Sequence, residues 1–180
     1  MPALLTLSIS LALMAPTPPA SAAPADGGAP LDAQVWTAEG RKVQLSSFWG
    51  KPTVLIYESR GATELNRLLK DALWRRGHDP AARDAAQVLG VAALPELDWF
   101  PARPLAEHAV RERQQKVGIP VLIDWKGALT GGGWQLQAGT SSVVVLDGRG
   151  RVAFRASGAL DHAQVQQVFG LLEQLTGHHS

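Results

Sequence analysis

Cysteine is absent from all 180 residues of the chain. Without a thiol, the protein forms no disulfide, performs no thiol redox chemistry, and has no cysteine nucleophile or cysteine metal ligand. A lipid anchor on cysteine is excluded for the same reason. The absence does not identify the compartment, because many exported proteins also lack disulfides.

Net charge is also nearly absent, since 17 Lys and Arg oppose 16 Asp and Glu for a formal charge of +1. Such a chain has no field that would gather nucleic acid or anionic lipid, so we predict no nucleic-acid partner. The five histidines show no pair at metal-ligand spacing within a helix. We therefore predict no metal site and no cofactor. The 46% of hydrophobic residues are enough to build one buried core.

The first 30 residues differ in composition from the rest. A mostly apolar run at 3–15 is followed by three prolines and then by the small residues of 20–23. This pattern is typical of a secretory signal peptide and is short for a membrane span, although Lys and Arg are missing before the run. We predict a signal peptide at 1–23, a linker at 24–30 and a domain at 31–177. The alternative is an apolar N-terminal arm. The preferred reading predicts export to the periplasm, with no stable membrane span after cleavage.

Strand patterns recur through the rest of the chain. Residues 53–57 (TVLIY) are apolar, aromatic and β-branched without polar alternation, which predicts a strand buried on both faces. Residues 141–154 predict a β-hairpin, because an apolar run, a turn rich in glycine and an alternating run follow one another. A leading hairpin is predicted over 35–45, and further strands over 87–93 and 118–124.

Helices are predicted between these strands. Leucines and alanines at helical spacing indicate a helix from about Thr63 to near Gly77, and residues 104–116 form a weakly amphipathic pattern. Asp161 is the predicted N-cap of the last helix, with Gln164 completing a capping box. Strands that alternate with helices indicate an α/β fold.

Residues 45–55 (LSSFWGKPTVL) resemble the loop and strand that precede the active site in thioredoxin-like and peroxiredoxin-like proteins, and 144–152 resemble their closing hairpin. A closer resemblance, carried by 134–136 (WQL), 141–147 (SSVVVLD) and 158–160 (GAL), is to the YtfJ-like family of small exported bacterial proteins. The resemblance implies a thioredoxin-like fold, with a central mixed sheet flanked by helices and an N-terminal β-hairpin.

The redox site of the thioredoxin-like proteins is missing. In redox-active relatives, cysteines follow the first strand at the start of a helix, and the matching positions here are near Ala62 and Leu65. The relatives place a cis-proline before the closing hairpin, where this chain has Ser141. A cis peptide bond without proline costs about 3 kcal/mol, so we expect a trans bond there. No thiol-disulfide reductase or thiol peroxidase activity is expected.

The first function hypothesis is a periplasmic binding or scaffolding protein that keeps the fold and has lost the redox centre. Its partner would be an unidentified protein or peptide, with main-chain groups of 140–142 pairing with an extended segment. Trp49 and Trp134 are candidates to line a ligand groove. The resemblance implies an interaction surface at Arg60, Asn66, Trp134 and Ser141.

The second hypothesis is an enzyme that uses non-thiol chemistry at the same cleft. The candidates for it are Glu58, Ser59, Arg60 and Thr63, although no catalytic motif supports them. Ser59, Thr63 and Arg60 also suggest an anion site at a helix N-terminus, against the simpler reading of turn and cap residues. Transcriptional regulation, a label that some family members carry, fits poorly with export and a near-neutral charge.

Overall fold

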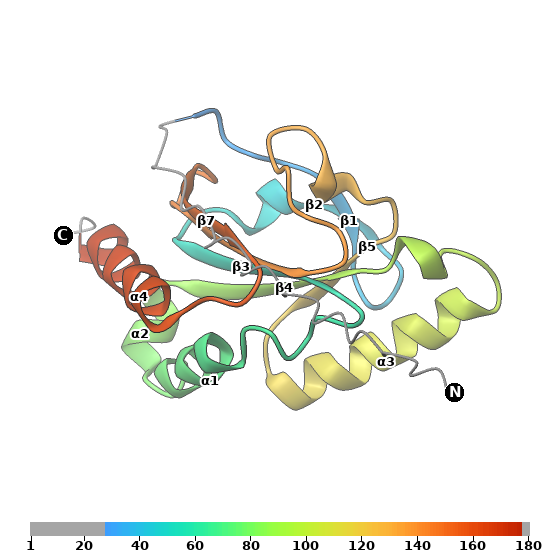
Figure 1. Cartoon of the computed structure of the whole chain (residues 1–180), viewed down its shortest axis with the longest axis horizontal. Helices are drawn as coiled ribbons and strands as arrows, with labels where there is room; N and C mark the ends of the chain where they lie inside the picture. Colours follow the sequence, from blue (N-terminus) through green and yellow to red (C-terminus); the bar gives the residue numbers. More distant parts are fainter. Residues whose placement is uncertain (1–27, 178–180) are drawn as a thin grey trace, which may run out of the picture.

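A seven-stranded mixed sheet organises the computed structural model, which describes residues 28–177 (Figure 1). The predicted signal peptide, most of the predicted linker, and His178 and His179 lie outside the described residues. The strands are β1 (Gln34–Trp36), β2 (Lys42–Gln44), β3 (Thr53–Ser59), β4 (Gln87–Ala93), β5 (Val121–Asp124), β6 (Ser141–Leu146) and β7 (Val152–Ser157). The α-helices are α1 (Arg67–Arg76), α2 (Pro80–Ala85), α3 (Ala102–Val117) and α4 (His162–Gly177). Short 3-10 helices are η1 (Leu45–Phe48), η2 (Pro95–Leu97) and η3 (Ala128–Thr130).

The strand order is β2-β1-β5-β4-β3-β6-β7. Strands β3, β4 and β5 run parallel, whereas β6 runs antiparallel to β3 and to β7. The leading β1–β2 hairpin joins the sheet through β5. The predicted hairpins and the burial of β3 are confirmed, and β6 lies inside the sheet with every residue buried. A continuous apolar run needs cover on both faces, which an interior position supplies.

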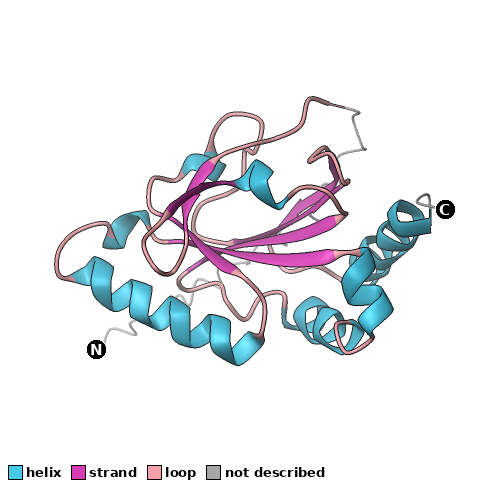
Figure 2. Ribbon diagram, turned by 180° about the vertical axis from the view of Figure 1, so that it is seen from behind, coloured by secondary structure: helices cyan, strands magenta, loops and turns pink. Residues whose placement is uncertain are grey.

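The α-helices pack on one face of the sheet, as Figure 2 shows from behind. Val54 and Ile56 of β3 contact a core that includes Leu69 and Leu73 of α1 and the buried residues of α4. On the same face, α3 covers β5 through Ala106 and Val110. None of the helices in the described part of the chain is long and apolar enough to cross a membrane.

The opposite face is covered by loops and 3-10 helices. Leu55 and Tyr57 of β3 point to this face and pack in a core with Leu45 of η1, Leu129 of η3 and Trp134. The strands are therefore apolar on both sides although the α-helices pack on only one of them.

The sequence predicts the start of α4 correctly but not the start of α1. The capping box at α4 is confirmed: the Asp161 carboxylate accepts from the Gln164 N–H (2.8 Å), and Gln164 Oε1 accepts from the Asp161 N–H (3.0 Å). The predicted start of α1 at Thr63 is wrong, because the helix begins at Arg67. Residues 59–65 form successive turns instead, closed by bonds from the Ala62 N–H to Ser59 O and from the Leu65 N–H to Ala62 O.

Core packing is tested by two matched phenylalanines. Phe154 of β7 is 1% exposed, whereas Phe100 is 85% exposed. We expect Phe154→Ala to lower the free energy of unfolding by about 3–5 kcal/mol, because it removes a packed ring and leaves a cavity. Phe100→Ala should change it by less than about 0.5 kcal/mol. Urea unfolding of both variants measures the difference, and equal effects would contradict the core described above.

Candidate functional site

The candidate site lies where the connection after β3 meets the segment before β6. The Ser59 N–H donates to the carbonyl oxygen of Thr140 (3.1 Å), and the Gly139 N–H donates to Ser59 Oγ (2.9 Å). These bonds hold residues 59–66, which contain the positions of the missing cysteines, against 139–141. The two segments therefore lie side by side.

Asn66 is the polar centre of this site and is buried. Its Nδ2 donates to Ser141 Oγ (2.8 Å) and to the carbonyl oxygen of Gly158 (3.0 Å). Its Oδ1 accepts from the Leu160 N–H (2.9 Å). One side chain thus joins the start of α1, the start of β6 and the connection from β7 to α4. Because the amide makes these bonds inside the fold, it is not presented to a ligand.

The main chain at 140–142 is also occupied. Thr140 O accepts from Ser59, Ser141 O accepts from the Gly158 N–H (2.8 Å), and Ser142 lies between Tyr57 and Ser157 in the sheet. The peptide bond before Ser141 is trans, as expected. The prediction that this segment pairs with an extended peptide is corrected, because β6 already has a partner strand on each side.

The four residues of the predicted interaction surface have different environments. Arg60 is exposed, whereas Asn66, Ser141 and Trp134 are buried. A partner at the surface can therefore contact Arg60 but not the other three side chains.

The two tryptophans that were predicted to line a groove each make a hydrogen bond within the fold. The Trp134 indole N–H donates to Asp32 O (3.0 Å), and the Trp49 indole N–H donates to Leu31 O (3.1 Å). Both rings also pack against the core on the loop-covered face. Both indoles thus hold residues 31–32. The groove prediction is wrong for Trp134, which is buried, whereas Trp49 lines a pocket together with Phe48, Lys51 and Gln87.

Two of the four candidates for non-thiol catalysis, Glu58 and Ser59, have side chains that are bonded within the fold. Glu58 forms an ion pair with Lys70 (2.8 Å), whose Nζ also donates to Thr63 O. Ser59 Oγ accepts from Gly139. Since α1 begins at Arg67, Ser59 and Thr63 do not stand at its N-terminus, and the predicted anion site is not formed. Within residues 28–177, no group of three or more His, Asp or Glu residues is placed to hold a metal ion.

Buried polar contacts near this end of the sheet include one pair that the sequence patterns did not indicate. Asp124 accepts the N–H groups of Lys126 (3.1 Å), Ala128 (2.9 Å) and Leu129 (3.0 Å) and so holds the turn that follows β5. Burial raises the pKa of the Tyr57 hydroxyl, and the hydrogen-bonded Asp124 carboxylate raises this pKa further. Tyr57 therefore stays protonated and braces β3 against β5. Two residues 67 positions apart carry no local sequence signal of such a contact.

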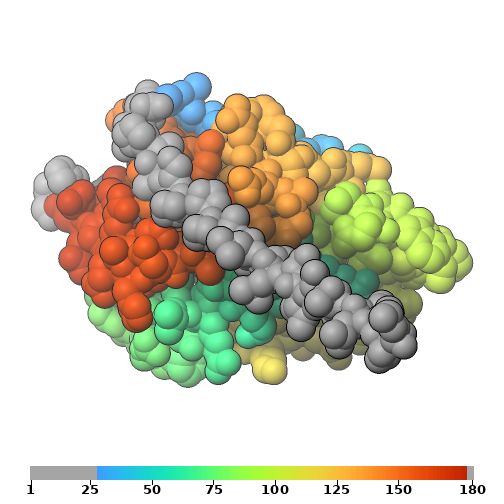
Figure 3. Space-filling view, in the orientation of Figure 1, coloured from blue at the N-terminus to red at the C-terminus, as the bar shows by residue number. Residues whose placement is uncertain are grey.

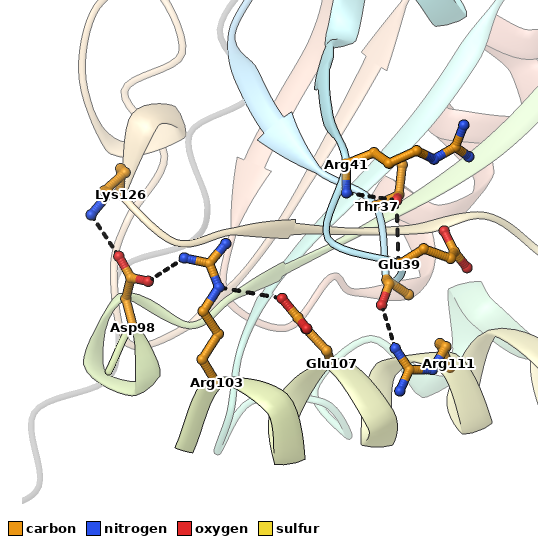
Figure 4. Close-up of polar contacts among 9 residues, drawn as sticks. Thr37, Glu39, Arg41, Asp98, Arg103, Glu107, Arg111 and Lys126 are labelled. Atoms are coloured by element: carbon orange, nitrogen blue, oxygen red, sulfur yellow. Dashed lines mark hydrogen bonds and ion pairs between the residues drawn. The ribbon is translucent and has the colours of Figure 1, made fainter. Parts of the chain in front are cut away.

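A cluster of charged side chains lies at the start of α3. The Arg103 guanidinium bonds to Asp98 (2.7 Å) and to Glu107 (3.3 Å), and it stands 4.9 Å from the centre of the Trp125 ring. Lys126 Nζ also contacts the Asp98 carboxylate (2.5 Å). Figure 4 shows Lys126 and Arg103 on either side of Asp98. The Lys126 hydrogen bond and both positive charges hold the pKa of Asp98 below its ordinary value of 3.8.

The fold superimposes on the solved structures of thioredoxin-like proteins. A secreted thiol-disulfide isomerase from Corynebacterium glutamicum superimposes with a TM-score of 0.58 at 17% identity, over 80% of this chain and 84% of that one. The fold is thioredoxin-like. A DsbF homologue from Corynebacterium diphtheriae gives a TM-score of 0.58 at 14% identity, over 79% of this chain and 85% of the other. The exposed lipoprotein thioredoxin Etrx1 of Streptococcus pneumoniae gives a TM-score of 0.56 at 18% identity, over 81% of this chain and 100% of the other.

The family resemblance is confirmed for the C-terminal part of the chain. Residues 107–175, which include β5, β6, β7 and most of α3 and α4, match the model of a bacterial protein family of unknown function, YtfJ_HI0045. The uncharacterized protein YtfJ of Escherichia coli (strain K12) is 46% identical over 54 residues. That match covers 30% of this chain and spans only 29% of the length of the Escherichia coli protein.

The contribution of the Asn66 contacts is testable by comparison with its exposed neighbour. Asn66→Ala should lower the free energy of unfolding by about 1–3 kcal/mol, because it leaves the buried Leu160 N–H and the Gly158 carbonyl without their partner. Arg67→Ala removes only an exposed ion pair with Asp71 and should cost less than about 1 kcal/mol. Urea unfolding measures both, and an Asn66→Ala variant as stable as the wild type would refute the assignment.

The Asp98 pairs predict a pH dependence. Because the folded-state pKa lies below 3.8, the pairs stabilise the protein above that pH and lose this contribution as pH falls through the folded-state value. The stability difference between the wild type and Asp98→Asn should therefore be present at neutral pH and shrink below pH 3.8. Urea unfolding of both proteins, from neutral pH to below pH 3.8, measures this stability difference. A difference that grows in acid would show that the sign is wrong.

Proposed function

We propose that this protein is a non-redox binding protein whose contact surface is the exposed rim of the vacated redox site. The rim consists of Arg60, Leu65, Arg67 and Leu68. A chain with no cysteine performs no thiol chemistry at this position, and the interior of the site is closed by the bonds of Asn66. The rim is what remains available for contact.

The observation that carries the proposal is the exposure of two leucines beside arginines on the connection into α1. Leu65 is 45% exposed and Leu68 is 56% exposed, and the Arg60 and Arg67 side chains are exposed with them. Isolated exposed leucines are ordinary, but a pair flanked by arginines suits a protein partner with apolar and acidic side chains. Arginine is also enriched among the residues that dominate interface energetics.

Two further features support a periplasmic binding role. The N-terminal composition is that of an export signal, and one protein of the same fold is described as a secreted isomerase. A non-thiol enzyme is a weaker candidate, since Glu58 and Ser59 are already bonded to neighbouring groups.

The test places a photo-crosslinking side chain at position 60 or 68 in living cells. We expect both positions to capture the same partner, because position 60 lies on the connection into α1 and position 68 in the first turn of that helix. In unlabelled competition experiments, Leu68→Asp should weaken binding of that partner by about tenfold or more, because it buries a charge in an apolar contact. Trp74→Asp is the matched control, since Trp74 is also an exposed apolar residue of α1 but lies outside the rim. Equal loss in both variants, or different partners at 60 and 68, would refute the rim as the contact surface.

A further inference from the structure

An apolar projection stands at the start of α3, on the other side of the molecule from α4. The tip, defined here as residues 98–105, presents Trp99 (57% exposed), Phe100 (85%) and Leu105 (69%) to solvent. Figure 3 shows the lime-coloured segment that includes η2 and the start of α3 protruding at the right-hand end, and Figure 2 shows the same segment at the edge of the molecule from behind. The tip is therefore convex, whereas a pocket for a small ligand is concave.

The polar groups of the tip are largely bonded within it. The Trp99 indole N–H donates to Glu96 O (3.1 Å), and the Trp99 main-chain N–H donates to Leu97 O (2.8 Å). Trp99 O accepts from the Arg103 N–H (2.9 Å), and Pro101 has no N–H to satisfy. Such a segment enters an apolar medium at low cost, because few hydrogen bonds to water are lost.

The charges around the tip are a cluster of paired side chains and the exposed carboxylate of Glu96. Asp98 lies between Arg103 and Lys126, and Arg103 also pairs with Glu107, as Figure 4 shows. This cluster has two positive and two negative groups and creates no strong field. The cluster therefore does not select a strongly acidic or strongly basic partner by charge.

We propose that the tip inserts into the interfacial layer of a phospholipid bilayer. Protein interfaces carry about one hydrogen bond per 100–200 Å², yet the Trp99 indole and main chain have already used their groups internally. A bilayer surface adapts to a convex shape and requires no directional bonds. Tryptophan is also enriched at membrane interfaces, where an apolar ring is stable beside polar groups. Association through so few side chains is shallow and reversible.

Trp99 supplies its own reporter for the test. The first 35 residues contain no tryptophan, so contact of the N-terminal segment with lipid produces no signal in tryptophan fluorescence. The full chain is titrated with phosphatidylcholine vesicles whose acyl chains carry bromine, a short-range quencher of tryptophan. We expect quenching in the wild type, its loss in Trp99→Phe, and its retention in Trp74→Phe, because Trp74 is 60% exposed but lies on α1.

The affinity of the tip follows from the lipid concentration at half-maximal quenching. Phe100→Ala should raise that concentration about tenfold, because a ring that is buried in lipid is lost. Replacing half of the phosphatidylcholine by the anionic phosphatidylglycerol should leave the lipid concentration at half-maximal quenching nearly unchanged. Three results would overturn the proposal: no quenching, equal loss in Trp99→Phe and Trp74→Phe, or quenching that requires the anionic lipid. Binding of the tip by a protein without quenching by vesicles would assign it to a protein pocket instead.

Discussion

The pairing of β3 with β6 is the interaction on which the rest of the structure depends. Six consecutive residue pairs join the two strands, from Thr53 with Leu146 to Glu58 with Ser141. Since side chains alternate along a strand, this ladder sends Val54 and Val145 to the face covered by α1 and α4, and Leu55 and Val144 to the face covered by loops. A slip of one residue would exchange the two faces, so the two different covers fix the register.

The same ladder brings the vacated redox site together. It ends at Glu58 and Ser141, and from there Ser59 bonds to Thr140 and Asn66 bonds to Ser141. The asparagine makes three hydrogen bonds where a ligand site would need free groups. The absence of thiols at this end of the molecule therefore goes with an interior that is closed by hydrogen bonds.

Two groups of exposed apolar side chains, at the start of α1 and at the tip, differ in their surroundings. Leu65 and Leu68 adjoin the exposed Arg60 and Arg67, whose ion pair with Asp71 is itself exposed to solvent, a combination that suits a protein partner. Trp99 and Phe100 adjoin charges that are paired with one another, and the Trp99 indole is bonded to Glu96. The rim thus presents solvent-exposed arginines that a protein partner can bind, whereas the polar groups of Trp99 at the tip are already bonded. For this reason we propose protein contact for the rim and lipid contact for the tip.

Local patterns were sufficient for much of the fold. The apolar run of β3, the turn at 147–150 and the capping box of Asp161 and Gln164 each depend on residues close in sequence, and all three are confirmed. The absence of cysteine determined the chemistry that the chain cannot perform, because no fold supplies a missing thiol.

Only the tertiary structure decided which candidate residues reach the surface. Asn66, Trp134 and Ser141 are polar or aromatic residues that sequence reasoning assigned to an interaction surface, yet their bonding partners lie 75, 102 and 75 positions away. The start of α1 moved from Thr63 to Arg67 because turns and long-range bonds, rather than helix propensity, organise the residues after β3. Contacts between distant segments leave no periodic signal in the chain, so burial at this site was settled by the packing of the sheet and not by the local sequence.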